Sequence, residues 1–106
     1  MGAETPLLAF FTDARSGPAR RMESLLAHLA RKQRGRLRVK RIDVGRHPDV
    51  AQRLRVDVVP TLLLIKERRV VERVEGRVSA PRIDRMLAPH LAPPAAQQTD
   101  RFFAPK

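Results

Sequence analysis

The sequence predicts an α/β domain in which one mixed β-sheet carries helices on both faces. Residues 7–11, LLAFF, form a continuous apolar run of strand length, which is typical of a central strand covered on both sides. Residues 22–30 then place apolar side chains at helical spacing, and residues 37–44 again have the length of a strand. This order predicts a right-handed crossover that leaves the two strands parallel. At 106 residues, the chain has room for one modest core.

The first helix has clear start and stop signals. Ser16 can cap it, while Gly17 and Pro18 occupy its first turn. We expect the helix to end near Gly35, because glycine is favoured just after helix C-termini. The apolar positions that define its buried face are Met22, Leu25, Leu26, Leu29 and Ala30.

The middle of the chain predicts a second helix and a hairpin. Residues 48–54 are expected to form a short helix. The apolar run 61–66, TLLLIK, predicts a third strand, and a tight connection at 67–69 leads into a segment of alternating polarity at 70–75. This arrangement is typical of two antiparallel strands joined by a short turn.

A final helix should follow Ser79, with Ile83, Met86, Leu87 and Leu91 on one face. The predicted order is therefore β-α-β-α-β-β-α, with the domain at residues 1–92. Residues 93–106 are rich in Pro, Ala and Gln, and this composition predicts a loose tail.

Three short motifs lie at the spacing of a known family. A strand leads into an X-Gly-Pro-X turn that opens a helix, and Val59, Pro60 and Thr61 follow at a fixed distance, with Gly76 further on. In this combination residues 6–92 resemble the thioredoxin family. The resemblance implies that Pro60 is cis and that these four residues line a peptide-binding groove. It also implies that Val59 offers its backbone N–H and C=O to an extended partner.

The same resemblance locates the sites where this chain departs from the family. The family's active turn is Trp-Cys-Gly-Pro-Cys, and the corresponding residues are Arg15, Ser16, Gly17, Pro18 and Ala19. The buried acid that assists proton transfer in the family corresponds to Phe10. Because thiol–disulfide exchange needs an attacking thiolate and a second thiol, we expect no enzymatic activity and no catalytic residue.

Two origins explain the missing thiols. Either this is a natural redox-inactive member, or a thiol–disulfide oxidoreductase had both cysteines, at positions 16 and 19, replaced by mutation. Replacement of two cysteines does not explain Phe10 or Arg15, so natural loss is favoured. We interpret Ser16 as a helix cap before considering it a nucleophile, since neither Asp13 nor a nearby histidine offers an obvious arrangement for a base.

The family usually has a strand and a helix ahead of the first strand found here, and we expect both to be absent. Residues 37–44 should then form an open edge strand. Basic side chains on this strand can block aggregation there. Alternatively, the edge accepts a partner strand or a second copy of the chain, which would give a homodimer.

The chain is strongly basic, with a net charge of +11 and 18 Arg against 4 Lys. This favours polyanions such as RNA or DNA, although a solvated surface is an equally simple explanation. With no Trp or Tyr, a stacking platform for bases is not expected. The densest basic stretch provides a candidate phosphate-binding patch: Arg31, Lys32, Arg34, Arg36, Arg38, Lys40 and Arg41.

Other sites are predicted mainly by exclusion. His28, His47 and His90 lack the spacing of metal ligands, so no metal or cofactor is expected. The apolar runs are too short to span a membrane, and we expect a cytoplasmic location.

In the tail, Phe102 and Phe103 are candidates for a docking motif, or for a cover over apolar surface.

The sequence therefore predicts a redox-inactive protein-binding or scaffold module. It would act through the cis-proline groove, the edge strand or the tail, on a partner that is acidic. The alternative is a basic accessory protein that binds RNA, DNA or ribosomes.

Overall fold

The computed structural model describes residues 5–91, and these contain the predicted succession of strands and helices. Within that range no helix is both long and apolar enough to cross a membrane. The predicted tail at 93–106, with Phe102 and Phe103, lies outside the described residues. In chain order the elements are β1 (Leu7–Thr12), α1 (Gly17–Lys32), β2 (Arg38–Asp43), α2 (Pro48–Arg53), β3 (Thr61–Lys66), β4 (Arg69–Glu75), α3 (Ala80–Leu87) and the 3₁₀ turn η1 (Ala88–His90).

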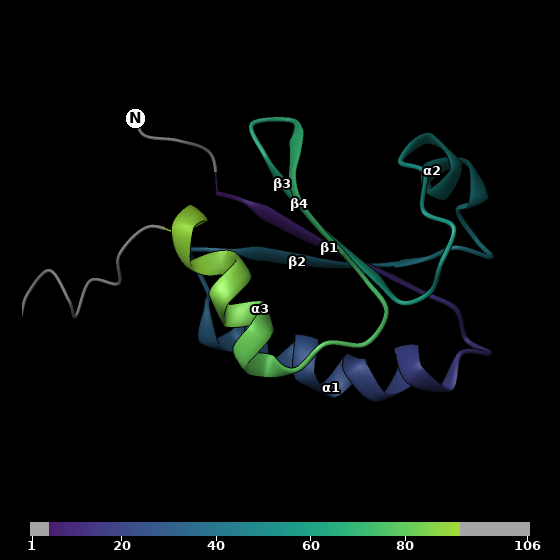
Figure 1. Cartoon of the computed structure of the whole chain (residues 1–106), viewed down its shortest axis with the longest axis horizontal. Helices are drawn as coiled ribbons and strands as arrows, with labels where there is room; N and C mark the ends of the chain where they lie inside the picture. Colours follow the sequence, from purple (N-terminus) through teal and green to yellow (C-terminus); the bar gives the residue numbers. More distant parts are fainter. Residues whose placement is uncertain (1–4, 92–106) are drawn as a thin grey trace, which may run out of the picture.

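The strands form one mixed sheet in the order β2-β1-β3-β4 (Figure 1). The pair β1 and β2 is parallel, as the crossover through α1 predicts, whereas β3 is antiparallel to both β1 and β4. Among residues 5–91 nothing pairs with the outer side of β2, so the expected edge strand is confirmed for this part of the chain.

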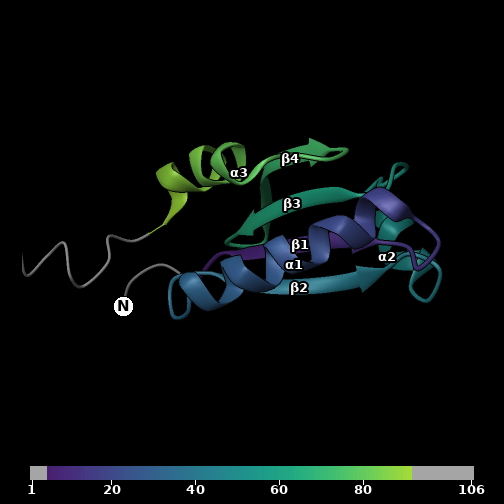
Figure 2. The same cartoon turned by 90° about the horizontal axis from the view of Figure 1, so that it is seen from below.

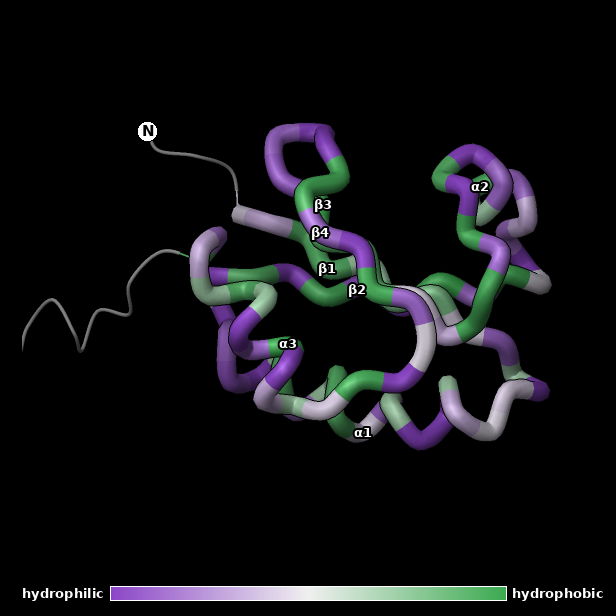
Figure 3. Tube along the Cα trace, viewed as in Figure 1, coloured by the Kyte–Doolittle hydropathy of each residue, from purple (hydrophilic) through white to green (hydrophobic). Residues whose placement is uncertain are grey.

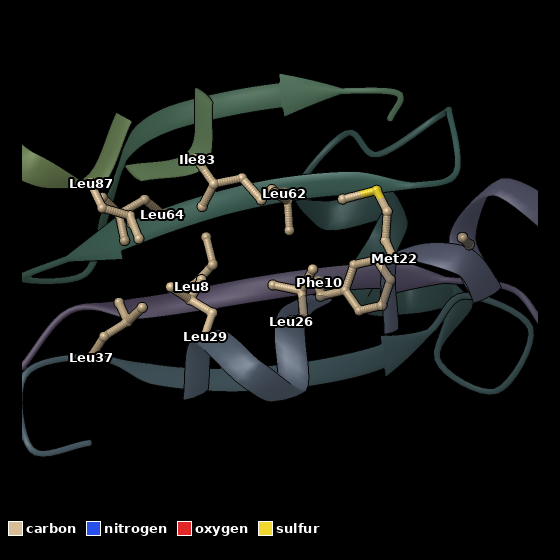
Figure 4. Packing of buried hydrophobic residues seen from close by; sticks show 11 residues of the cluster. Leu8, Phe10, Met22, Leu26, Leu29, Leu37, Leu62, Leu64, Ile83 and Leu87 are labelled. Atoms are coloured by element: carbon tan, nitrogen blue, oxygen red, sulfur yellow. The ribbon is translucent and has the colours of Figure 1, made fainter. Parts of the chain in front are cut away.

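Helices cover both faces of the sheet, as predicted. Helices α1 and α3 lie on one face and α2 on the other, near one end (Figures 1 and 2). Successive side chains of a strand point to opposite faces. Thus Leu8 and Phe10 belong to the cluster under α1 and α3, while Ala9 and Phe11 belong to the cluster under α2. Figure 4 shows the larger cluster. The continuous apolar run in β1 follows from its burial on both faces.

Helix α1 begins as predicted but ends slightly earlier than Gly35. The hydroxyl of Ser16 accepts a hydrogen bond from the N–H of Ala19 at 3.1 Å, which caps the first turn. Lys32 is the last helical residue, and Gln33 is the C-cap. Gly35, with φ +85°, provides the left-handed backbone of the turn that leads into β2.

The tight connection between β3 and β4 has an unusual backbone for its residues. Glu67 and Arg68 form a two-residue loop, with φ values of 54° and 68°. Loops of this kind require positive φ at both positions and strongly favour Asn and Gly. A larger L-residue in the left-handed region costs roughly 1–2 kcal/mol. The turn therefore keeps two charged side chains at a cost in local stability.

Candidate peptide-binding site

Three loops from distant parts of the sequence meet at one end of the sheet. In the sheet register, Phe11 near the end of β1 lies opposite Thr61 at the start of β3, and Thr61 lies opposite Glu75 at the end of β4. The turn after β1, the Val59–Pro60 segment before β3 and Gly76 after β4 therefore share this end, which also carries the N-terminus of α1 (Figures 1 and 2). Residues 15–19 of this turn and the predicted groove residues Val59, Pro60, Thr61 and Gly76 therefore lie at the same end of the sheet, where the peptide-binding site is predicted.

The turn after β1 is held by local hydrogen bonds. The N–H of Ser16 donates to the carbonyl of Asp13 at 2.9 Å, and the N–H of Arg15 donates to the Asp13 carboxylate, also at 2.9 Å. The Arg15 side chain is 92% exposed and, within residues 5–91, makes only a long ion pair with Asp13, with 3.7 Å between Nε and Oδ1. The site thus presents an arginine at the position where the resemblance implies tryptophan.

No activated nucleophile is present in the described part of the site. The Ser16 hydroxyl caps α1, and no carboxylate or histidine within residues 5–91 forms a hydrogen bond with it. Ala19 is fully buried and carries only a methyl group. Serine acts as a nucleophile only beside a base that accepts its proton. The geometry therefore favours the capping role for Ser16.

Replacing Ser16 with alanine tests that role. We expect the free energy of unfolding to fall by about 1 kcal/mol, because the N–H of Ala19 loses its acceptor. Urea denaturation of the two proteins measures the difference. Ser16→Asp is the matched control, because a carboxylate also caps well, and it should retain most of the stability. Equal stability of Ser16→Ala and the parent protein would contradict the capping role.

The loop before β3 is fixed on both sides of Val59. The Val59–Pro60 peptide bond is cis. The hydroxyl of Thr61 donates to the Val58 carbonyl at 2.6 Å, and the N–H of Gly76 donates to the Pro60 carbonyl at 2.8 Å. Within the described chain neither the N–H nor the C=O of Val59 has a hydrogen-bond partner. The loop is therefore anchored while the backbone of Val59 stays free to bind.

The interior behind the site is apolar. Phe10 is 1% exposed and packs in the cluster under α1 and α3. Thr12 is fully buried, and its hydroxyl has no hydrogen-bond partner. Within residues 5–91 no three His, Cys, Asp or Glu side chains are grouped so that they could hold a metal.

The predicted basic patch at residues 31–41 is centred away from this site. Some of its side chains are paired within the fold and the others are not. Its residues run from the last turn of α1 into β2. Lys32 forms a long ion pair with Asp84 at 3.9 Å, and Arg41 pairs with Glu23 at 3.2 Å. Arg36 donates to the Gln33 side chain at 2.6 Å. The remaining four residues are exposed, and none of them forms an ion pair within residues 5–91: Arg31, Arg34, Arg38 and Lys40.

The edge strand β2 has an apolar recess beside it. A surface cavity of about 280 Å³ opens between β2 and α1, with the Glu23–Arg41 ion pair among its lining groups. Its apolar lining consists of Phe10, Leu26, Ala27, Ala30 and Val39. A partner strand or a second copy of the chain at this edge stays a prediction.

Comparisons with known proteins agree with this architecture. A family model described as Thioredoxin matches residues 2–89. A thioredoxin-like protein of Synechocystis is 31% identical over 75 residues, and the match covers 71% of each chain. Mouse mitochondrial thioredoxin is 32% identical over 76 residues, which cover 72% of this chain and 46% of that protein. The solved structure of a thioredoxin from Nicotiana alata superposes with a TM-score of 0.78 at 28% identity, and the match covers 83% of this chain and 75% of that one.

Proposed function

Since this chain belongs to the thioredoxin family, we propose that it is a redox-inactive member that binds an extended polypeptide segment at the Val59–Pro60 loop. The observation that carries the proposal is the free backbone N–H and C=O of Val59 in a loop whose neighbouring groups are already paired. An extended partner can bond to both groups and so add a short strand beside the loop.

The loss of redox function rests on the sequence. None of the 106 residues is a cysteine. The reaction needs a thiolate to attack a disulfide and a second thiol to release the mixed disulfide. Ser16 and Ala19 supply neither group, so we propose that this protein is not an oxidoreductase and acts by binding.

The surroundings of the loop favour an acidic partner. Arg15, Arg20 and Arg21 are exposed near the N-terminus of α1, at the same end of the sheet. Val58, which is 43% exposed, offers apolar contact beside the free backbone groups. Because the loop is already ordered, a partner loses little entropy in fixing it. The exposed arginines would mainly raise the association rate and the specificity.

Affinity capture from a lysate of the source organism, with and without nuclease, tests the proposal. We expect a defined protein that survives both nuclease and high salt. Its binding segment should then protect the Val59 amide from hydrogen exchange. The Gly76 amide is an internal control, because its hydrogen bond to the Pro60 carbonyl already exists.

Two results would overturn the proposal. In one, no protein is captured under any of these conditions and only nucleic acid is recovered. In the other, a protein binds but leaves exchange at Val59 unchanged. A double substitution Arg15→Glu and Arg20→Glu, compared with Arg34→Glu and Arg38→Glu at the other end of the sheet, measures the contribution of charge near the loop. The first pair should slow association with an acidic segment more than the second pair does.

A further inference from the structure

The two ends of the sheet differ in charge. At the end with the Val59–Pro60 loop, acidic residues accompany the strands: Asp13 follows β1, Asp43 ends β2 and Glu75 ends β4. At the opposite end, the turn between β3 and β4 contains Glu67 as its acidic residue. At the loop end these acids are mixed with Arg15, Arg20 and Arg21, whereas at the hairpin end basic residues predominate over Glu67.

The sheet register brings basic residues from two distant sequence segments to this opposite end. Leu7, at the start of β1, pairs with Arg38 on one side and with Ile65 on the other. Lys66 pairs with Arg69 across the hairpin. The turn containing Arg34 leads directly into β2 at the same end. By the register Arg38 points to the α2 face of the sheet, whereas Lys66 and Arg69 point to the face covered by α1 and α3, so these cations surround the rim of this end. We call the rim residues Arg34, Arg38, Lys66, Arg68 and Arg69 the hairpin-end patch.

The cations of the hairpin-end patch are available to a ligand. Its four arginines are exposed and Lys66 is half-buried. Within residues 5–91 no carboxylate forms an ion pair with any of the five. In Figure 3 the turn between β3 and β4 is strongly hydrophilic. No internal partner therefore has to be displaced before these groups contact an anion.

The backbone of the hairpin turn is a second, independent observation. Glu67 and Arg68 both have positive φ, in a loop where Asn and Gly would fold with less strain. Residues held in sparsely populated backbone regions are enriched at ligand-binding positions. A turn selected for stability alone would not need Arg68. Its presence therefore points to a role for the side chain outside the fold.

We propose that the hairpin-end patch binds the phosphate backbone of a nucleic acid without reading its sequence. The patch lies across the end of four strands, and three strand spacings amount to about 14 Å. Measured along the helix axis, each strand of a duplex contributes one phosphate every ~3.4 Å, so this width spans about four phosphates of one strand. Four of the five cations are arginines, whose planar guanidinium groups donate two hydrogen bonds to one phosphate.

The surface beside the patch favours nucleic acid over a membrane. Val70 and Val71, which are 42% and 37% exposed, are the large apolar side chains exposed near the hairpin turn among the described residues. Two valines on a strand provide far less apolar area than the amphipathic helices that insert into lipid. Within residues 5–91 the aromatic side chains are Phe10 and Phe11, and both are buried, so this part of the chain offers no platform on which bases could stack. Binding by charge alone should therefore depend strongly on salt and weakly on sequence.

Fluorescence anisotropy with labelled RNA, single-stranded and duplex, tests the proposal on the full chain. The substitutions Arg38→Glu and Arg68→Glu are compared with Arg46→Glu and Arg53→Glu, which change the net charge equally at the opposite end. We expect the first pair to weaken binding about tenfold or more and the second pair to have little effect. For the duplex, the logarithm of affinity should fall with the logarithm of salt concentration with a slope of about three to four. The first pair should reduce that slope by about two.

A second variant, Arg68→Gly, removes the cation without disturbing the fold, because glycine adopts the positive φ of this turn without strain. This variant should fold at least as well as the parent protein and still bind RNA more weakly. Equal weakening by the two glutamate pairs would overturn the proposal, since the effect would then come from net charge. Stronger binding to vesicles of anionic lipid than to RNA would also overturn it, as would a marked preference between RNA sequences.

Discussion

Replacing Phe10 with aspartate should destabilise the fold by about 5 kcal/mol or more at neutral pH. Phe10 is 1% exposed and packs among Met22, Leu26 and Leu62 (Figure 4). The cation beside it, Arg41 on β2, is already paired with Glu23 at 3.2 Å, so an introduced carboxylate would have to compete for it. Loss of the ring alone costs about 3–5 kcal/mol, and burial of an unpaired charge adds to this. Because small domains are stable by only ~5–15 kcal/mol, much of the protein should be unfolded. Circular dichroism and urea denaturation measure the effect.

The pH dependence of the stability of Phe10→Asp distinguishes the effect of the buried charge from the effect of the cavity. Burial raises the pKa of the introduced carboxyl in the folded state above its value in the unfolded chain. The folded state then binds the proton more tightly, so the added destabilisation is small at acidic pH and grows as the pH rises. Phe10→Ala leaves a cavity without a charge and should show no such added dependence. Equal stability of the two variants at neutral pH would contradict the apolar environment assigned to Phe10.

The double substitution Ser16→Cys and Ala19→Cys should produce thiol–disulfide exchange where the parent protein has none. The introduced thiols would stand at the N-cap and three residues later, at the start of α1. The helix dipole and Arg15 favour a thiolate at the first position. That thiolate attacks a disulfide and releases one thiolate product. The thiol at position 19 then attacks the mixed disulfide, which releases the second product and leaves an intramolecular disulfide.

The assay reagent is an aromatic disulfide that releases a coloured thiolate when it is attacked. The absorbance therefore gives the number of thiolates released per protein. The double variant should release two thiolates per protein. Ser16→Cys alone should release one and keep the other half of the reagent bound. Ala19→Cys alone should react slowly, since position 19 is fully buried. If the double variant released a single thiolate, the geometry of the turn would differ from that of the family. If the natural gene encoded cysteine at both positions, thiol–disulfide exchange would be the natural activity of this protein.

Local patterns predicted most of the fold. The apolar run in β1, the helical spacing in α1 and the alternation in β4 depend on residues within a few positions of each other, and all three elements are present. The sequence alone placed the end of α1 near Gly35, whereas the helix stops at Lys32 because the turn into β2 uses the positive φ of that glycine. The resemblance supplied the residues of the loop site, which the sheet register then brings to one end.

The basic surface was predicted less well, because it depends on tertiary structure. The sequence marks residues 31–41 as one dense stretch. In the fold, Lys32 and Arg41 pair with acids on other segments, whereas Arg68 and Arg69 arrive from a hairpin some thirty positions later. Only the register of β1 with both neighbours places these segments at one end. A charge count along the chain contains no such information.

The position of β1 in the sheet has a consequence for the order of folding. This strand is the first in the described chain, yet it lies between β2 and β3, and its side chains enter both buried clusters. Its contacts with β2 close a loop through α1, but those with β3 join residues about fifty positions apart. Neither cluster is complete until Thr61–Lys66 has docked. During synthesis, Phe10 and Phe11 therefore lack part of their packing until most of the domain has left the ribosome, and folding should then proceed as one cooperative step.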